Sequence, residues 1–419
     1  MTQPDKVQDM SKETNAKPHV VIVGGGFAGL AALNHLRHLL HKRVRITLID
    51  KSQHTVNRPM MPEIAFEGKA AADSLIPMFK AVSGADTSLI YGSVVTVATD
   101  QNTVLLDDGL SMSYDYLILA PGPVHDYAAV AGLEQFGHSI CDETHAAALW
   151  QALHDFKGGN VVIGSAPTAH GSRVAAPVLK AACEGPVGEA MFMMDRHLRH
   201  RGVRDKGSIR IFSPASIFFE DVGNEVHKHM GPLVERAGIA VTTDLVITRV
   251  DASQVEFADG TTWDSDFTIV LPPHAPPAFI AASGLSDEVG WVPTDTEMRH
   301  LDHANIFGAG DCNALSQPKL GHIAALQGEI AATTIARELD PETAALAYAP
   351  EVLCIMNRGG HEATLIASNS LYGGELDVAV SGSIPHMMKW SFDAYYGFRH
   401  GELPPDWSEK ILEWGLRHL

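Results

Sequence analysis

A glycine-rich turn after a short apolar run constrains this chain more than any other feature. Residues 19–23 (HVVIV) end at Gly24-Gly25-Gly26-Phe27-Ala28-Gly29, and residues 30–40 then have helical spacing. A buried strand, a tight turn and a helix N-terminus in this order bind a dinucleotide pyrophosphate, because free N–H groups and the helix dipole attract anions. A second strand, residues 45–50, ends at Asp50, which is placed to accept a hydrogen bond from a ribose hydroxyl. The pattern predicts a Rossmann-like dinucleotide-binding unit.

Two later motifs indicate which dinucleotide binds. Residues 117–122 (LILAPG) resemble the segment of flavoprotein disulfide reductases that runs close to the FAD pyrophosphate. Residues 306–311 (IFGAGD) resemble their second FAD signature, in which the aspartate bonds the ribityl chain. With the glycine-rich turn, these motifs resemble the FAD-dependent pyridine nucleotide-disulfide oxidoreductase superfamily, which implies one bound FAD. The cofactor-binding residues that the resemblance implies are Gly24, Gly26, Phe27, Ala28, Asp50, Lys51, Arg58, Val95, Ala120, Pro121, Gly122, Gly310, Asp311, Lys319, Gly321 and His322.

The same strand–glycine pattern begins again at residues 160–164 (NVVIG), which indicates a second domain inserted into the first. We predict an α/β fold of two Rossmann-like domains of the glutathione-reductase type that share one FAD. The predicted boundaries are a disordered lead at 1–17, the FAD domain at 18–125 and 300–345, the second domain at 126–299, and a C-terminal segment at 346–419.

The second glycine motif is degenerate. In residues 161–171 (VVIGSAPTAHG), Ala166 occupies the place of the second glycine, where a Cβ would crowd a pyrophosphate. No clear acidic ribose ligand follows the next strand, which ends near residue 214. The second domain is therefore predicted to bind NADH poorly.

The cysteines distinguish the chain from the disulfide reductases, because it has four of them and no CxxC pair. Ser139-Ile140-Cys141 with His145, and Cys183 with the segment after it, resemble active-site segments of the sulfide:quinone oxidoreductases. Residues 353–356 (LCIM) resemble that family's C-terminal active-site segment, residues 318–321 (PKLG) its Pro-Lys-Thr-Gly, and residues 388–390 (MKW) its Gly-Lys-Trp near the quinone. The resemblance covers residues 18–419.

The resemblance implies that sulfide is oxidised to polysulfide or sulfur by a cysteine relay and FAD, which passes electrons to a membrane quinone. It implies the catalytic residues Cys183, Cys354, Cys141 and His145, and the quinone-site residues Lys389, Phe392 and Tyr396. Cys312 matches no functional position and is expected to be a small core residue. No metal site is predicted.

Two departures qualify the match. The segment between Gly164 and Cys183 carries about a dozen more residues than the family pattern. The loop that usually supplies a second histidine contains Phe218, Phe219, Glu220 and Asp221 instead, and Glu220 is one candidate to replace that base.

Composition and the tail bear on partners. The formal net charge of −19 argues against nucleic acid and against electrostatic adhesion to anionic lipid. Residues 385–400 and 406–419 carry tryptophans at amphipathic helical spacing, which predicts a peripheral membrane anchor and a quinone entrance, or else a face packed on the core or on another subunit. Neither a signal peptide nor a membrane-spanning helix is expected, and the side of the membrane and homo-oligomerisation are left open.

Three alternatives remain at this point. A type II NADH:quinone dehydrogenase shares the fold, the flavin and the quinone, but it needs a working second nucleotide site. A flavocytochrome c-type sulfide dehydrogenase would be exported and would lack a membrane tail. A flavin-binding sensor without enzymatic activity is the least favoured.

Overall fold

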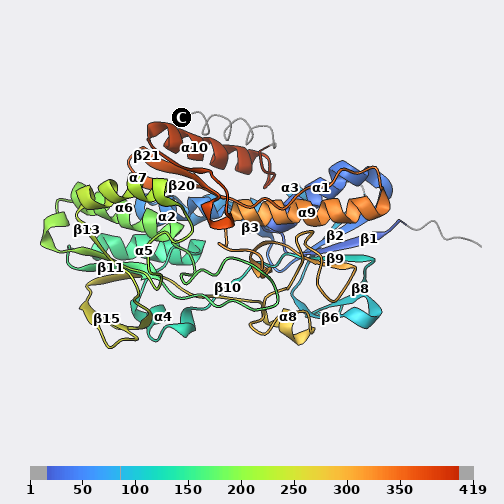
Figure 1. Cartoon of the computed structure of the whole chain (residues 1–419), viewed down its shortest axis with the longest axis horizontal. Helices are drawn as coiled ribbons and strands as arrows, with labels where there is room; N and C mark the ends of the chain where they lie inside the picture. The colour runs from blue at the N-terminus through green and yellow to red at the C-terminus, as the bar shows by residue number, and fades with distance from the viewer. Residues whose placement is uncertain (1–16, 85, 405–419) are drawn as a thin grey trace, which may run out of the picture.

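The computed structural model describes residues 17–84 and 86–404. Two α/β lobes lie side by side along the long axis of the molecule, and C-terminal strands and a helix cross above them (Figure 1). The predicted lead falls outside these residues except for Lys17, and the predicted helix at 406–419 lies wholly outside them.

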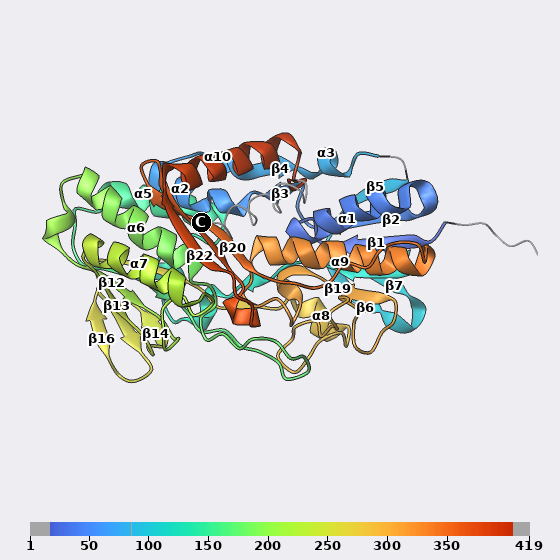
Figure 2. The same ribbon diagram turned by 45° about the horizontal axis from the view of Figure 1, so that its top comes forward.

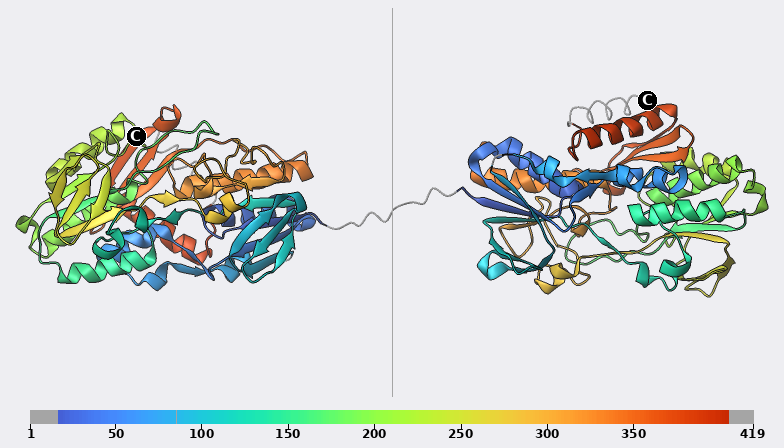
Figure 3. Two further views of the ribbon diagram at one scale, coloured as in Figure 1. Left: turned by 90° about the horizontal axis from the view of Figure 1, so that it is seen from below. Right: turned by 180° about the vertical axis from the view of Figure 1, so that it is seen from behind.

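The first lobe is built on a five-stranded parallel sheet of order β19-β9-β1-β2-β5. Its strands are β1 (His19–Val23), β2 (Arg45–Asp50), β5 (Thr87–Tyr91), β9 (Tyr116–Leu119) and β19 (Ile306–Gly308). Successive side chains of a strand point to opposite faces, so the apolar strands bury both. Val20 and Ile22 pack with α1 (Phe27–Leu40) and α9 (Gly321–Leu339), whereas Val21 and Val23 pack against β6 (Val94–Ala98) and β7 (Thr103–Leu106). Together with β8 (Ser111–Ser113), β6 and β7 cover the face opposite the helices (Figure 3).

The second lobe repeats this architecture with a parallel sheet of order β13-β12-β11-β17. Its strands are β11 (Val161–Ser165), β12 (Ile209–Phe212), β13 (Ile239–Thr242) and β17 (Phe267–Leu271). They are accompanied by α5 (Glu143–Asp155), α6 (Gly185–His200), α7 (Asn224–Ala237) and the antiparallel β14 (Ile247–Val250), β15 (Gln254–Phe257) and β16 (Thr262–Asp264). The predicted α/β class with two Rossmann-like domains is therefore confirmed.

Short elements complete and connect the lobes. The first lobe contributes β3 (His54–Val56), α2 (Met61–Glu67), β4 (Leu75–Pro77) and α3 (Met78–Val82), and α4 (Leu133–Phe136) and α8 (Ala278–Ala282) follow later. An antiparallel pair, β10 (Val124–His125) and β18 (His274–Ala275), joins the segment that leaves the first sheet to the segment that leaves the second.

The segment after β11 differs from a nucleotide-binding unit, because no helix follows the strand directly. Residues 166–182 form a closed loop whose ends are joined by hydrogen bonds from Ala182 N to Ala166 O (2.9 Å) and from Thr168 N to Lys180 O (3.0 Å). Arg173, near its tip, pairs with both carboxylate oxygens of Asp302 at 2.9 Å. The extra residues found in the sequence therefore form a strap from the second lobe to the first.

The C-terminal part forms an antiparallel sheet and a helix between and above the lobes (Figure 2). Its elements are β20 (Val352–Gly359), β21 (Glu362–Ser368), β22 (Asp377–Gly382) and α10 (Ser383–Phe398). In the described residues, the chain contains no helix with the length and hydropathy that a bilayer crossing requires.

Candidate active site

The β1–α1 turn has the geometry of a pyrophosphate cradle. Gly24 has φ +102°, and a Cβ there would lie 2.1 Å from Ala120 O. A Cβ on Gly29 would lie 1.8 Å from Gly24 O, so this glycine lets the helix pack against the turn. A Cβ on Gly26 would meet nothing within 4 Å, and α1 begins at the next residue without a side-chain cap or an acidic first turn. The open space over Gly26 and the uncapped helix N-terminus suit an anionic phosphate.

Asp50 closes this cradle at the end of β2. Its Oδ2 accepts a hydrogen bond from Gly25 N (2.6 Å), and its Oδ1 accepts one from Ser52 N (2.7 Å). Each carboxylate oxygen has a second lone pair, so a ribose hydroxyl can still donate to Asp50. Lys51, the next residue, is exposed.

Asp311 supplies an acceptor that lacks a partner. Its Oδ1 is buried and has no hydrogen-bond partner among the residues that the structure describes. Burial raises the pKa of Asp311, and the charges of Lys319 and Arg58 oppose that rise. Gly310 holds the preceding turn with φ +75° and donates its N–H to Gln327 Oε1 at 2.8 Å. An orphaned acceptor at the end of β19 fits a hydroxyl of a ribityl chain, as the motif predicts.

Lys319 places a positive charge beside Asp311. Its Nζ donates to Asp311 O at 2.6 Å and lies 3.8 Å from the ring centroid of Trp291. Burial lowers the pKa of Lys319 to about 8, although the charge of Asp311 opposes the shift. Helix α9 begins two residues later at Gly321, whose Cβ would lie 3.3 Å from the Phe27 ring. A lysine and a helix N-terminus at one point stabilise negative charge on a neighbouring group.

The other predicted cofactor residues have mixed environments. Ala120 is buried, and Gly122 has φ +70° with open space beside it; Pro121 lies between them. Ala28 is buried at the start of α1, and His322 lies in the first turn of α9. Val95 lies on β6 with 43% of its surface exposed, and Arg58 is exposed and donates to Cys141 O at 2.8 Å. Taken together, the cradle and the orphaned Asp311 fit FAD.

Three of the cysteines converge on one core. Cys141 lies two residues before α5, Cys183 lies two residues before α6, and Cys354 is on β20. All three pack, partly buried, against the hydrophobic cluster that contains residues of α2, α5, α6 and β20. A Cβ on Gly185 would lie 4.0 Å from Cys354 Sγ. The fold thus gathers cysteines that are far apart in the sequence.

Burial and negative neighbours keep these thiols protonated. Burial, then Asp221, then the charges of Cys141 and Cys354 raise the pKa of Cys183 well above its ordinary value. Burial raises the pKa of Cys141 to about 11 and that of Cys354 to about 12. As free thiols they would be weak nucleophiles at neutral pH. Cys312 is fully buried in the first lobe, where its thiol donates to Leu119 O at 3.3 Å, as expected of a core residue.

His145 lies on the first turn of α5, beside Cys141. Its Nδ1 is hydrogen-bonded to Asp142 at 2.7 Å, and its ring stacks on Tyr127 with centroids 4.0 Å apart. The Tyr127 hydroxyl donates to the same oxygen, Asp142 Oδ2, at 2.9 Å. Asp142 therefore orients His145, and neither Asp142 nor Tyr127 belongs to a motif that would have singled it out in the sequence.

Asp221 is the acid that sequence reasoning missed. The predicted substitute base, Glu220, is used otherwise: its Oε1 accepts hydrogen bonds from Lys180 N (2.6 Å) and Ala181 N (2.7 Å), which fix the end of the strap. The next residue, Asp221, has its pKa raised to about 6 by burial, and its charge raises the pKa of both Cys183 and Cys354. The sequence shows an acid beside Glu220, but it does not show which of the two side chains faces the cysteines.

Lys389 lies in a buried ionic cluster that joins four elements. Its Nζ lies 3.0 and 3.2 Å from the two carboxylate oxygens of Glu63 on α2 and 3.8 Å from Glu189 Oε1 on α6. Asn357 on β20 donates its backbone N–H to Glu189 (2.8 Å) and its side-chain amide to Glu63 (2.7 Å). Asp393, one turn along α10, has its pKa raised by burial against the opposing charge of Lys389. We name Glu63, Glu189, Lys389, Asn357 and Asp393 the ionic cluster.

The other two residues predicted for the quinone site form an aromatic stack. Tyr396 is fully buried, and its ring stacks on Phe27 at 5.1 Å and on Phe392 at 5.7 Å. Since Phe27 begins α1 at the cofactor cradle, this stack leads from the cradle to α10.

The chain was compared with known proteins. The model of the family described as pyridine nucleotide-disulphide oxidoreductase matches residues 18–328. The chain belongs to this family. Members bind FAD, so the protein is an FAD-dependent oxidoreductase.

Individual relatives extend the match. The sulfide-quinone reductase of Aquifex aeolicus is 26% identical over 94% of each chain, and the mitochondrial sulfide:quinone oxidoreductase of Mus musculus is 25% identical over 75% of this chain and 70% of its own. The solved structure of the Aquifex aeolicus sulfide:quinone oxidoreductase superposes with a TM-score of 0.83 at 24% identity and covers 95% of both chains, which shows a shared fold. The family resemblance found in the sequence is confirmed.

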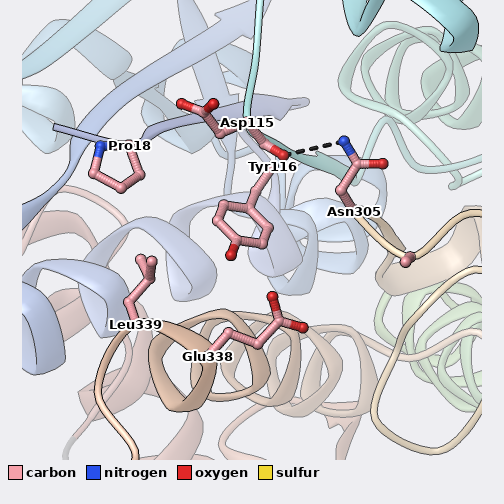
Figure 4. Close-up of a pocket in the computed structure, with 7 residues that line it drawn as sticks. Pro18, Asp115, Tyr116, Asn305, Glu338 and Leu339 are labelled. Atoms are coloured by element: carbon pink, nitrogen blue, oxygen red, sulfur yellow. Dashed lines mark hydrogen bonds between the residues drawn. The ribbon is translucent and has the colours of Figure 1, made fainter. Parts of the chain in front are cut away.

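A surface hollow at the amino ends of the strands of the first sheet is a poor candidate for the cofactor site. Pro18, Asp115, Tyr116 and Asn305 line it, and Asn305 donates to Asp115 O (Figure 4). These residues stand at the amino ends of β1, β9 and β19, whereas ligands of open parallel sheets bind at the carboxyl ends. The cradle, Asp50 and Asp311 are all at the carboxyl ends.

Proposed function

We propose that this flavoprotein oxidises sulfide through Cys183 and Cys354 and passes the electrons by way of FAD to a membrane quinone. The observation that carries the proposal is the convergence of Cys141, Cys183 and Cys354 on one core beside the FAD residues. The names of the two relatives described above support the same substrates.

The first step suits an oxidised resting pair. Hydrosulfide attacks one sulfur of a Cys183–Cys354 disulfide; a new S–S bond forms and the old one breaks, which leaves a persulfide on one cysteine and a thiolate on the other. The raised pKa values of the free thiols favour this order, since the cysteines are poor nucleophiles and hydrosulfide is a good one. FAD, when bound, accepts the two electrons and passes them on. Lys319 and the N-terminus of α9 would hold the negative charge that reduction brings to this edge of the site.

The alternative NADH:quinone activity is less well supported. An NADH dehydrogenase-like protein of Mycobacterium tuberculosis is 26% identical over 70% of this chain, so the comparisons do not exclude that activity by themselves. However, β11 leads into the strap and not into a helix, and Ala166 is fully buried at the point where a pyrophosphate needs glycine. The strap and Ala166 therefore take the place of the glycine turn that a dinucleotide pyrophosphate needs directly after the first strand.

Helix α10 supports contact with a membrane. Lys389 and Tyr396 face inward and are buried, whereas Ile384, Met387 and Trp390 are between 64% and 70% exposed. An apolar outer face on a helix whose inner face joins the cradle suits a peripheral protein that takes its quinone from lipid. The predicted contact of Lys389 with a quinone carbonyl stays a prediction, because its ammonium is held by Glu63.

The test is anaerobic addition of sulfide, and separately of NADH, to the purified yellow protein. Sulfide should bleach the flavin absorbance fast enough that stopped flow is needed to follow it, and a short-chain quinone should restore the absorbance. NADH should leave the protein yellow. Bleaching by NADH without any response to sulfide would overturn the proposal. Reoxidation by cytochrome c but not by quinone would favour the flavocytochrome alternative.

A further inference from the structure

A buried tryptophan joins the strap to the cofactor residues. Trp291 lies in the segment between α8 and β19, and its side chain is only 1% exposed. Its indole N–H donates to Ala169 O of the strap at 3.1 Å. The face of the same ring receives the Nζ atom of Lys319, which lies 3.8 Å from the ring centroid. One side chain therefore contacts the strap through its edge and a cation of the cofactor site through its face.

The backbone on both sides of Trp291 is fixed to its neighbours. Asp287 Oδ1 accepts a hydrogen bond from Trp291 N at 2.9 Å, and Asp287 N donates to Trp291 O at 2.8 Å. The next residue, Val292, donates its N–H to Cys312 O at 2.9 Å, directly after Asp311. The ring is therefore held beside the Asp311 turn by the fold of the first lobe as well as by the strap.

Lys319 is a cation that the fold has removed from water. It is 7% exposed, and its Nζ donates to a neutral carbonyl, Asp311 O, at 2.6 Å. Burial lowers the pKa of Lys319 to about 8, and the charges of Asp311, Cys312 and Asp287 oppose that shift. The face of a desolvated indole attracts an ammonium more strongly than a neutral amine, so Trp291 favours the charged form.

We propose that Trp291 is a positioning residue for the flavin: its ring holds the Lys319 ammonium charged and in place, so that the ammonium stabilises the negative charge of the reduced cofactor. An ammonium has three N–H groups, so Lys319 can donate to Asp311 O and still donate to the cofactor. The ring thereby raises the reduction potential of the flavin and makes it a better electron acceptor. This role depends on the bound FAD and not on the substrate that reduces it, so it goes beyond the proposed function.

The test measures the two-electron midpoint potential of the bound flavin at pH 7.5, by slow enzymatic reduction with xanthine oxidase against a reference dye and without sulfide or quinone. A buried cation–π contact favours the charged amine by about 30-fold. Trp291→Leu removes the ring and should shift the flavin equilibrium toward the oxidised form by about ten-fold, which lowers the potential by about 30 mV. Trp291→Phe keeps an aromatic face without the hydrogen bond to the strap, and it should stay within about three-fold of wild type.

Lys319→Met shows whether the ring acts through the lysine. This variant removes the charge and should lower the potential at least as far as Trp291→Leu does. In the double variant, loss of the ring should add less than about two-fold to the loss of the lysine, because residues that act as one unit are not additive. A ring effect of the same size with and without Lys319 would overturn the proposal.

Trp263→Leu is the matched control. Trp263 on β16 is also a buried tryptophan with a cation over its ring, since the guanidinium carbon of Arg210 lies 3.6 Å from the ring centroid. Both residues belong to the second lobe and to neither FAD motif, so the loss of Trp263 should leave the flavin potential unchanged.

Fluorinated tryptophan provides a second measurement if Trp291→Leu does not retain FAD. Fluorine withdraws electron density from the face of the ring while the ring keeps its shape, which weakens a cation–π contact. When all six tryptophans of the chain are replaced in this way, the potential should fall in wild type and stay unchanged in Trp291→Phe.

A wild-type potential in Trp291→Leu, or a fluorination effect of the same size in Trp291→Phe, would overturn the role of Trp291. An equal fall in Trp291→Leu and Trp291→Phe would also overturn it, because the aromatic face would then be irrelevant. None of these results affects the proposed function, which is tested by bleaching with sulfide. Conversely, a wild type that sulfide does not bleach would remove the proposed substrate and leave the role of Trp291 standing.

Discussion

Replacing Lys389 by methionine should cost the protein several kcal/mol, because it leaves two buried carboxylates without their cation. Lys389 and Glu63 are only 4% and 5% exposed, and they are joined at 3.0 and 3.2 Å. Methionine has a similar length and is apolar, so it preserves most of the packing of α10. Removing one partner of a buried pair typically costs about 3–5 kcal/mol. We expect a loss in that range for the free energy of unfolding at pH 8.

The loss should shrink as the pH falls. Burial by itself would raise the pKa of Glu63, but the charge and hydrogen bond of Lys389 outweigh burial and hold this pKa below its ordinary value. In wild type, Glu63 therefore contributes stability that is present above its unfolded pKa and lost as the pH falls through its folded pKa. In Lys389→Met the opposition disappears, and the pKa of Glu63 should rise above the unfolded value. The variant then takes up a proton on folding, which reduces its deficit by up to about 1.4 kcal/mol per pH unit.

The assay is urea unfolding of the FAD-loaded protein at pH 8 and pH 5.5, followed by far-UV circular dichroism. The double variant Lys389→Met with Glu63→Gln should recover a large part of the loss, since it removes the unpaired charge. Lys228→Met is the matched control: Lys228 pairs with Glu225 at 2.6 Å, but both side chains are more than 60% exposed, and its loss should cost less than about 1 kcal/mol. A loss below about 1 kcal/mol for Lys389→Met at pH 8, or a larger loss at pH 5.5 than at pH 8, would refute this reasoning.

Other substitutions address the cofactor, the cysteines and the membrane. Cys183→Ser and Cys354→Ser should each abolish sulfide-dependent flavin reduction in stopped flow with FAD retained, whereas Cys312→Ser should stay near wild type. Full turnover in Cys183→Ser would refute the proposed role of the cysteines. Asp311→Ala should weaken FAD binding by about 10- to 100-fold in titrations of the apoprotein, because one hydrogen bond from a charged group is worth about 1.5–3 kcal/mol, and unchanged affinity would remove Asp311 from the site. Trp390→Ser should lower co-sedimentation with neutral lipid vesicles by about 10-fold or more, and high salt should not release the wild type; equal sedimentation of variant and wild type would make α10 a packing element.

The cradle could be predicted from the sequence because its requirements are local. A strand, three glycines at fixed spacing and an acid at the end of the next strand impose their geometry within some thirty residues. The structure bears this out in Gly24 and Gly29, where any Cβ would overlap the backbone.

The strap could be predicted only as extra length. Its course depends on the pairing of Arg173 with Asp302, which are more than a hundred residues apart in the chain. The candidate role of Glu220 as a base could not be judged from the sequence for a related reason. Two adjacent acids point in different directions, and only the hydrogen bonds to Lys180 N and Ala181 N show that Glu220 fixes the strap while Asp221 faces the cysteines.

The ionic cluster also fixes the segments that carry Cys183 and Cys354 relative to each other. Cys183 lies just before α6, which carries Glu189, and Cys354 shares β20 with Asn357. Asn357 bonds Glu189 through its backbone and Glu63 through its side chain. Helix α6 and strand β20 are therefore tied together three residues from Cys354 along the strand and six residues from Cys183 along the helix. Burial raises the pKa of Glu189 to about 7 even with Lys389 nearby. Glu189 therefore gains or loses its proton within the physiological pH range. A change of charge on Glu189 acts directly on Cys354, whose pKa it raises after burial. The same buried group therefore ties α6 to β20 and adds to the burial that keeps Cys354 protonated.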